Sequence, residues 1–527
     1  MHGFSKNVTF NKCTFNCDGK AVLVYNEGSI SKTDLNVTNT TFTASALVEG
    51  KAAIEIDTSL MKGQTKITVD QATADKTTGF DTGSNSGSSL WNDKKQKAES
   101  NKNTTVVVAG TTVFAPPAVA KIGDTEYPTL ADAITAADEN ATVTLLKDVT
   151  VTNPIEVTKS MTLDLNGHVL TAATASDRSE SKDEKNSAIW VTAENVNLTI
   201  NGMTAGSGMK MGDTHNTDWK TKVWGFVDLR DGSAGSTVTI NGGSYTGSTC
   251  ASDNNHYTAL FTVGSESKLV LNNVSAETDE RVVKASSCGE VVVSGGTYNI
   301  TGINAFLGAA FETKTASFTD MKLTAKYGGC VQVGSNATLE NCEIKVTKIR
   351  TGAGTHLNCA VAVQNDGTAT VKSGIYTAPY AAYVYNSGGT INIENGTFTG
   401  VVRADATTGT TAVINIKNGS FNGEIQKGGG PGSETIAISG GTFSSAVPEN
   451  CCAPGFEPTQ NGNTYGVKIK ANMVAEVLDA QGNTVGAYGK LADAINAASN
   501  GDTVTLLKDV TENVTIPANK TCLLYTS

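Results

Sequence analysis

Two segments of the sequence concentrate residue types that could bind a sugar. They are MKMGDTHNTDWKTKVW (209–224) and TCASDNNHY (249–257). Aromatic rings stack on the apolar faces of sugars, while carboxylates accept hydrogen bonds from hydroxyl groups. The candidate glycan-binding residues are therefore Asp213, His215, Asp218, Trp219, Asp253, His256 and Tyr257.

The same segments allow two other interpretations. They could be polar loops in which Trp219 or Trp224 packs against the wall of the protein. His215 and His256 could also share a metal ion, but the chain contains no CxxC pair of the kind that zinc sites use. We predict no metal and no cofactor.

The sequence offers little for catalysis. A glycoside hydrolase needs paired carboxylates as acid and as base or nucleophile. The nearest grouping is TDERVVK, in which Asp279 and Glu280 precede Arg281. One acidic pair beside one arginine is more typical of a surface ion pair, so we expect no catalytic residues. The alternative is a polysaccharide-active enzyme in which Arg281 and these carboxylates act.

A short repeat must position these segments. A strand followed by Asn-Gly or Ser-Gly and then an aromatic residue recurs, as in INIENGTF (391–398) and VINIKNGSF (413–421). The turn glycines Gly374, Gly396, Gly419 and Gly440 are 21 to 23 positions apart. Such a period, with strands and turns but no L-x-x-L-x-L spacing, favours a parallel β-helix.

Stacked coils give each side chain a predicted place. Alternation puts Ile391 and Ile393 on the inner face, and Phe398, Phe421 and Phe443 should pack over one another. Ile200 and Ile240 are 40 positions apart, about twice the usual coil, so a long loop must project there. Long loops on successive coils fall side by side, which would bring the two candidate segments together, with the polar segment 176–190 just before them.

A second, much longer repeat spans the chain. TVTLLKDVT occurs at 142–150 and at 503–511, and LADAITAA (130–137) returns as LADAINAA (491–498), both 361 positions apart. We therefore predict the C-terminal part of one β-helix unit, a complete unit and the start of a third, as in a piece of a longer protein. The predicted boundaries are 1–114, a linker at 115–127, 128–468, a linker at 469–486, and 487–521.

The repeated segment begins with a predicted helix. Leu130, Ala133, Ile134 and Ala137 form one apolar stripe, with Thr129 as the N-cap. An open solenoid end needs a cover, so we expect this helix to cap each unit, although an ordinary surface helix has the same pattern. In the strand that follows, Val143 and Leu145 should point inward.

Composition excludes several classes of protein. The 527 residues carry a net charge of −11 and a pI of about 5.1, which argues against a nucleic-acid partner. No apolar run is long enough to span a membrane, and the cysteines lack the density of a disulfide framework.

CLLYTS (522–527) resembles a translated sequencing adapter and is predicted to be non-native, the alternative being a genuine apolar strand.

Three stretches carry a resemblance to a known group. They are TLADAITAADENATVTLLKDVT (129–150), MTLDLNGHVL (161–170) and GGTFSSAVPENCCAPGFEPTQNGNTYGV (440–467). They resemble large repetitive, adhesin-like cell-surface proteins of gut bacteria, whose domains are similar to pectate-lyase-type β-helices.

The resemblance implies an all-β chain of tandem right-handed parallel β-helix domains at the cell surface. Its ligand would be a polysaccharide or a surface glycan, although a passive spacer would look the same. The polygalacturonase motifs NTD, DD, GHG and RxK are not present in order, since His168 lies in NGHV.

Overall fold

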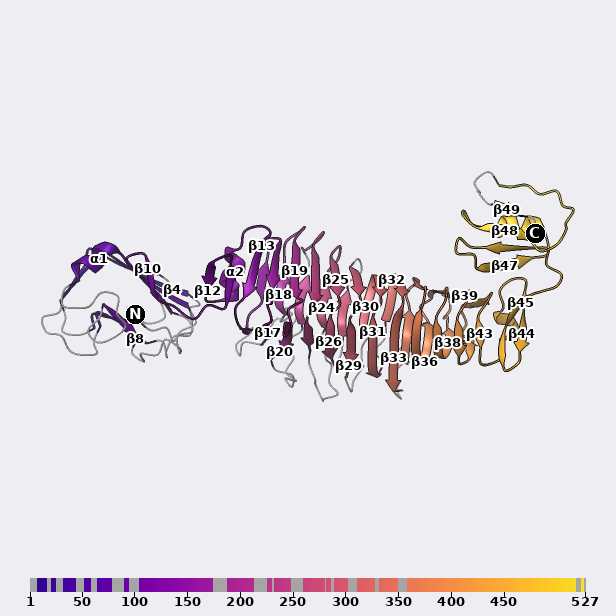
Figure 1. Ribbon diagram of the computed structural model, residues 1–527, viewed down its shortest axis with the longest axis horizontal. Coiled ribbons are helices and arrows are strands. Elements are labelled where there is room, and N and C mark those ends of the chain that lie inside the picture. Colours follow the sequence, from indigo (N-terminus) through magenta and orange to yellow (C-terminus); the bar gives the residue numbers. More distant parts are fainter. Residues whose placement is uncertain are drawn as a thin grey trace. The chain divides into compact units, whose positions relative to one another are not determined.

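A computed structural model describes most of the chain (Figure 1). The described residues are 7–16, 20–24, 32–43, 52–57, 64–77, 90–93, 104–173, 187–212, 225–229, 232–247, 259–279, 281–285, 289–301, 310–327, 331–348, 358–517 and 523–525. The chain divides into two compact units, residues 1–133 and 134–527. Both units consist mainly of parallel β-strands, as predicted.

Strands of the first unit wind into coils of three strands. The first strands, β1 (Asn7–Asn11), β4 (Lys32–Thr38), β7 (Gln64–Val69) and β9 (Thr104–Val108), pair in parallel. The second and third strands are β2 (Thr14–Asn16) and β5 (Thr41–Thr43), then β3 (Val22–Val24), β6 (Ile54–Ile56) and β8 (Trp91–Asp93). In the third coil, helix α1 (Gln71–Lys76) follows β7, where the two earlier coils have their second strand. Asp70 caps this helix by accepting a 2.7 Å hydrogen bond from the Thr73 N–H.

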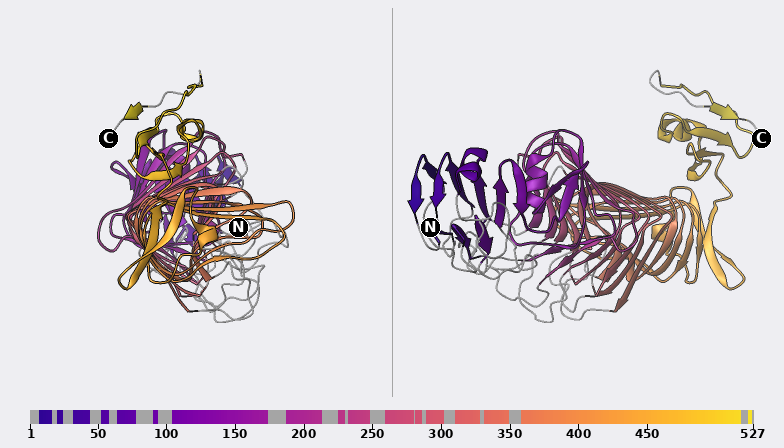
Figure 2. Two further views of the ribbon diagram at one scale, coloured as in Figure 1. Left: turned by 90° about the vertical axis from the view of Figure 1, so that its right-hand side faces the viewer. Right: turned by 60° about the vertical axis from the view of Figure 1, so that its left-hand side comes forward.

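The second unit continues this design as a long parallel β-helix (Figure 2). Each coil contributes one strand to each of three columns, defined here by the order of the strands within a coil. The first-strand column contains β13 (Ala141–Leu145), β16 (Met161–Asp164), β19 (Asn197–Gly202), β22 (Thr237–Gly242), β25 (Lys268–Asn272), β28 (Glu290–Ser294), the second half of β30 (Phe311–Thr319) and of β32 (Val331–Glu340), β35 (Gly367–Val371), β37 (Gly389–Ile393), β39 (Thr411–Ile416) and β42 (Ser433–Ile438).

The other two columns pair in the same parallel manner. The second-strand column contains β14 (Val149–Val151), β17 (Val169–Ala172), β20 (Gly208–Met211), β23 (Ser244–Thr246), β26 (Ser275–Thr278), β29 (Thr297–Ile300), β31 (Lys322–Tyr327), β33 (Cys342–Lys348), the first halves of β36 (Gly374–Val384) and β38 (Thr397–Ala404), β40 (Ser420–Asn422) and β43 (Thr442–Phe443). The third-strand column contains β15 (Ile155–Val157), β18 (Ser187–Val191), β21 (Gly225–Leu229), β24 (Ala259–Val263), β27 (Arg281–Ala285), the first halves of β30 and β32, β34 (Cys359–Val363), the second halves of β36 and β38, and β41 (Ile425–Lys427).

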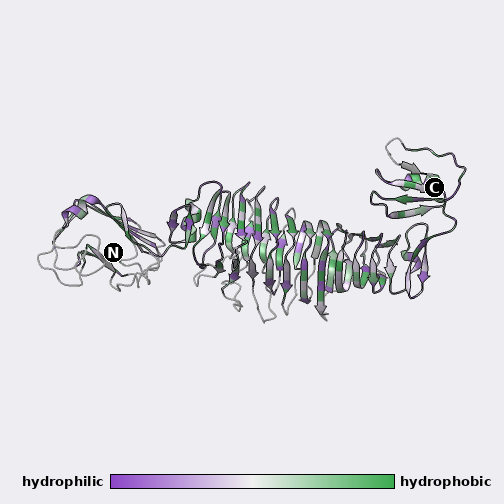
Figure 3. Ribbon diagram, viewed as in Figure 1, coloured by the Kyte–Doolittle hydropathy of each residue, from purple (hydrophilic) through white to green (hydrophobic). Residues whose placement is uncertain are grey.

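Hydrophobic and polar residues alternate along many of these strands (Figure 3), and the hydrophobic residues fill the interior. Val143, Leu145, Ile391 and Ile393 are fully buried, as predicted. Tyr376, Phe398, Phe421 and Phe443 form a continuous stack with centroid distances of 4.9, 5.0 and 4.8 Å and interplanar angles of 14° or less. The predicted packing of the three phenylalanines is therefore confirmed.

Glycines with positive φ turn the chain before each stacked ring. Gly396 and Gly419 have φ of 137° and 125°, values that L-residues with a side chain rarely adopt. In the next coil the equivalent residue is Gly441, not the predicted Gly440, because Ser420 pairs with Thr442. The sequence alone could not choose between two adjacent glycines in SGGTF.

Helix α2 (Leu130–Ala136) forms where it was predicted. The Asp132 N–H donates to Thr129 Oγ1 over 3.0 Å, which is the expected N-cap bond. Leu130, Ala133 and Ile134 are buried, as is Ala137 just beyond the helix. Lys159 donates to the Ala137 carbonyl over 2.9 Å, so the end of the helix is tied to the first coil.

Both predicted linkers contain strands. β11 (Ala120–Ile122) and β12 (Thr125–Tyr127) form an antiparallel hairpin before α2. β46 (Ala475–Leu478) and β47 (Thr484–Tyr488) do the same before α3 (Leu491–Ala497). Each repeated segment therefore begins with a hairpin rather than with a free linker.

Antiparallel strands follow the last coils. β10 (Thr111–Phe114) pairs with β9, and β45 (Thr464–Ile469) pairs with β43 and with β44 (Phe456–Asn461). Residues 523–525, in the tail predicted to be non-native, form β49, which pairs in parallel with β48 (Thr503–Leu506); the origin of the tail stays a prediction.

Candidate functional site

All seven predicted glycan-binding residues lie outside the described part of the chain. Asp213, His215, Asp218 and Trp219 belong to the segment 213–224, and Asp253, His256 and Tyr257 belong to 248–258. The described strands on either side fix where each segment leaves and rejoins the β-helix. We call the adjoining strand ends the anchors of each segment, and they are the structural basis of the candidate site.

The anchors of the two segments are aligned. The first segment runs from β20 to β21 and the second from β23 to β24. β20 pairs in parallel with β23, and Val227 of β21 pairs with Phe261 of β24. Both segments therefore connect the second-strand column to the third-strand column on adjacent coils, with their ends about 4.8 Å apart along the stack.

We call this connection between the second-strand and third-strand columns the corner. On other coils it also consists of segments outside the described residues. The segment 174–186 joins β17 to β18, 302–309 joins β29 to β30, and 349–357 joins β33 to β34. The strand ends that flank these segments therefore lie at one corner of successive coils, and the predicted side-by-side arrangement of the loops stays a prediction.

Strands that follow this corner are buried on both faces. All five residues of β21 (GFVDL) and of β34 (CAVAV) are buried. Because adjacent residues of a strand point to opposite faces, burial of all five means that both faces are covered. The continuous apolar run CAVAV is a signal of this burial that the sequence already contains.

Arg281 lies in this buried column. Its side chain is 6% exposed, and its Nε lies 3.0 Å from Glu312 Oε2 on the next coil. Asp279 and Asp228 are also buried, whereas Glu280 lies outside the described residues. Arg281 was expected on a solvated turn, and that part of the expectation is wrong. This buried ion pair links neighbouring coils, and its burial presents little of the guanidinium to a substrate.

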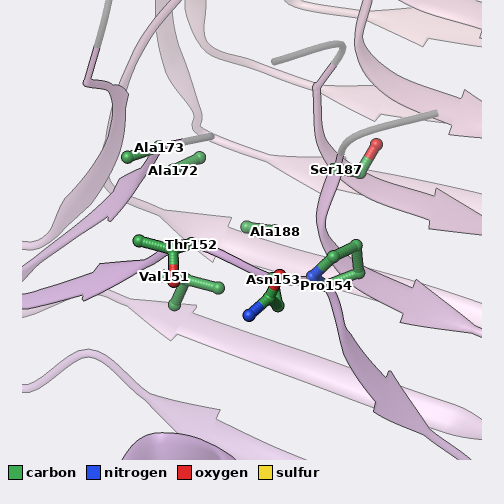
Figure 4. A pocket seen from close by; sticks show the side chains of 8 residues that line it. All are labelled: Val151, Thr152, Asn153, Pro154, Ala172, Ala173, Ser187 and Ala188. Atoms are coloured by element: carbon green, nitrogen blue, oxygen red, sulfur yellow. The ribbon is translucent and has the colours of Figure 1, made fainter. Parts of the chain in front are cut away.

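A small hollow opens near the same corner (Figure 4). Val151, Thr152, Asn153 and Pro154 face Ala172, Ala173, Ser187 and Ala188 across it. Its empty volume is about 180 Å³ including open solvent, whereas ligand pockets usually enclose about 300–1,000 Å³. The hollow is too small, and too poor in charged groups, to be a ligand pocket.

Within the described ranges, no three His, Cys, Asp or Glu side chains gather as a metal site would need. In that same part of the chain, no helix combines the length and the apolar character needed to cross a lipid bilayer.

One cluster was not expected from the sequence. Tyr380, Tyr383 and Tyr385 gather beside Arg403 and Asp405 on the third-strand column. The sequence signal for this cluster is the tyrosine-rich run YAAYVY (380–385).

Comparison with known proteins found no matching family model, no matching curated protein and no matching solved structure. The fold and the arrangement of its segments therefore carry the functional argument.

Proposed function

We propose that this chain is an extracellular, adhesin-like structural protein whose β-helix presents glycan-binding loops and catalyses no reaction. The observation that carries the proposal is the alignment of the anchors of 213–224 and 248–258 on adjacent coils. Aligned anchors make it feasible for Trp219 and Tyr257 to share one ligand. Repeated units in one chain would add avidity.

A surface location rests on the resemblance to repetitive proteins of gut bacteria. The polar outer positions of the first-strand column and the acidic net charge of −11 suit a rod in water. A long sequencing read through the locus tests the location. A signal peptide upstream and a wall anchor downstream would support it, and a cytosolic catalytic domain in the same frame would contradict it.

The proposed lack of catalytic activity is argued from the position of Arg281. Its burial and its ion pair with Glu312 favour a structural role over attack on a polysaccharide. Incubation with polygalacturonate tests this point. We expect no unsaturated or reducing uronate product, whereas release of product that is lost in Arg281→Lys would establish a polysaccharide-active enzyme.

Binding itself is tested on an array of immobilised surface glycans and plant polysaccharides. We expect retention on at least one glycan, weakened at least about tenfold in the double variant Trp219→Ala/Tyr257→Ala, since aromatic anchors commonly carry that much. Tyr465→Ala, a half-buried tyrosine of β45, is the matched control. Unchanged binding of the double variant to every glycan on the array would show that the loop site is wrong, and retention on no glycan would favour a passive spacer.

A further inference from the structure

The third-strand column carries a cluster of aromatic and polar side chains near the C-terminal end of the β-helix. Tyr383 of β36 pairs with Arg403 of β38, and Arg403 pairs with Gln426 of β41. Since the strands are parallel and in register, these three residues follow one another along the stack about 4.8 Å apart. We name Tyr380, Tyr383, Tyr385, Arg403, Asp405 and Gln426 the tyrosine patch.

The three tyrosines pack against one another. The rings of Tyr380 and Tyr383 stack at 5.3 Å and 26°, and those of Tyr383 and Tyr385 meet edge to face at 5.8 Å and 72°. Tyr383 is 1% exposed, and the other two are half-buried. A regular strand would place residues 380 and 383 on opposite faces. The register shifts between Thr377 and Ala382 bring both rings into one cluster.

An ion pair holds the polar side of the patch. Arg403 Nε donates to both carboxylate oxygens of Asp405, at 2.9 and 3.1 Å, and Tyr383 donates its hydroxyl to the same carboxylate. Burial lowers the pKa of Arg403, but the hydrogen bond and the charge of Asp405 outweigh burial and raise it. Arg403 therefore keeps its positive charge, and the Asp405 carboxylate lies directly against it.

Backbone geometry fixes this pair in place. A Cβ added to Gly428 would lie 1.4 Å from Asp405 Oδ1, so only glycine permits the carboxylate to sit there. In the loop after Gly428, the N–H groups of Gly429 and Gly430 donate hydrogen bonds to the carboxylate of Glu434 in β42, at 2.9 and 3.0 Å. This carboxylate also accepts one from the Ala406 N–H. The polar groups of the patch are thus preorganised.

We propose that the tyrosine patch is a second binding site, and that its ligand is a neutral glycan. Half-buried tyrosine rings offer an apolar surface to the flat face of a pyranose, next to a fixed carboxylate and an amide that can bond its hydroxyl groups. A uronate would require an available cation, and Asp405 already neutralises Arg403. The proposal shares its ligand class with the proposed function, but it uses none of the loop residues.

The test measures binding of the full chain to soluble β-glucan and galactomannan, with polygalacturonate as the anionic probe. We expect retention by a neutral probe, weakened at least about tenfold in Tyr380→Ala/Tyr385→Ala. Trp219→Ala/Tyr257→Ala should retain this binding, which separates the patch from the loop site. Tyr380→Phe keeps the ring and should bind like the wild type, while Tyr465→Ala serves as the matched control.

Three results would overturn the proposal. They are no retention by either neutral probe, unchanged retention in the double tyrosine variant, and retention by polygalacturonate alone. Circular dichroism of each variant establishes that it is folded. If the double variant fails to fold, the single variants Tyr385→Ala and Gln426→Ala, both at half-buried positions, decide the matter by the same criterion.

Discussion

At the scale of single residues, the interior aromatic stack is a main determinant of the β-helix. Phe421 is 3% exposed and lies between Phe398 and Phe443 at 5.0 and 4.8 Å. Phe421→Ala should lower the free energy of unfolding by about 3–5 kcal/mol. Asn422→Ala, an exposed position on the same strand, should change it by less than about 0.5 kcal/mol. Denaturant unfolding of both variants measures the difference, and equal effects would contradict the stacked interior.

Cys342 offers a chemical test of the same interior. Burial raises the pKa of its thiol to about 11, despite hydrogen bonds that oppose the shift. The thiolate is the reactive form, so iodoacetamide near pH 8 should modify Cys342 only when the chain unfolds. The half-buried Cys13 is the comparison within the same chain. Mass spectrometry of the peptides measures both, and similar rates in the folded protein would contradict the model of the core.

Glu434 should make the loop beside the tyrosine patch sensitive to acid. Burial alone would raise the pKa of Glu434. Hydrogen bonds from the N–H groups of Gly429, Ala406 and Gly430, together with the charge of Arg403, lower it by more, so the pKa lies below the usual 4.5. The charged Glu434 carboxylate therefore stabilises the folded chain above about pH 4.5. This stabilisation is lost as the pH falls through the pKa that Glu434 has in the folded state. Glu434→Gln should cost about 1 kcal/mol near pH 7, discounted for solvent screening, and less near pH 3.

Unfolding of wild type and variant at both pH values measures this difference. Glu424→Gln, an exposed carboxylate of the preceding coil, serves as the control and should change the free energy of unfolding near pH 7 by less than about 0.5 kcal/mol. A cost for Glu434→Gln that is equal at both pH values would show that the carboxylate charge is not what holds the loop.

At the scale of elements, the N-cap of α2 is the sharpest agreement between sequence and structure. Thr129 caps the helix as predicted. In α3 the corresponding residue is Lys490, which makes no side-chain cap bond, and Glu512 accepts from the Leu491 N–H over 2.9 Å instead. Both copies of the repeat therefore form the helix. In α3 a residue distant in the sequence supplies the hydrogen-bond acceptor that the N-cap side chain supplies in α2.

Thr129→Ala should destabilise α2 by about 1 kcal/mol, because the Asp132 N–H loses its acceptor. Thr129→Ser keeps the hydroxyl and should leave the helix unchanged. Hydrogen exchange at residues 130–136 measures both variants. Equal protection in Thr129→Ala and in the wild type would mean that other contacts hold the helix.

Elements were predictable from sequence where one rule decided their structure. Alternation fixed the inward residues of β13 and β37, and the 3.6-residue period fixed α2. The hairpin β46–β47 lies where the sequence suggested a linker, because the long repeat marked the start of the next unit only from the helix onward. The tyrosine patch was missed because residues 380 and 383 share a cluster only through a register shift, which no sequence pattern announced.

At the scale of the whole molecule, the 361-residue period is a repeat of structure. β11, β12, α2 and β13 return in the same order as β46, β47, α3 and β48. Antiparallel strands after the last coils of each β-helix cover edges that would otherwise pair with other chains. The candidate site could be predicted only as far as its anchors, because the path of a long polar loop is not set by periodicity.

Hydrogen exchange of the full chain with its best-bound glycan shows where on the β-helix the glycan binds. We expect slowed exchange in peptides that cover 213–219 and 253–257, with the glycan recovered at its original length. Slowed exchange only elsewhere would contradict the loop site, and slowing confined to 380–405 would transfer binding to the tyrosine patch. A shortened glycan would contradict the claim that this β-helix binds without catalysis.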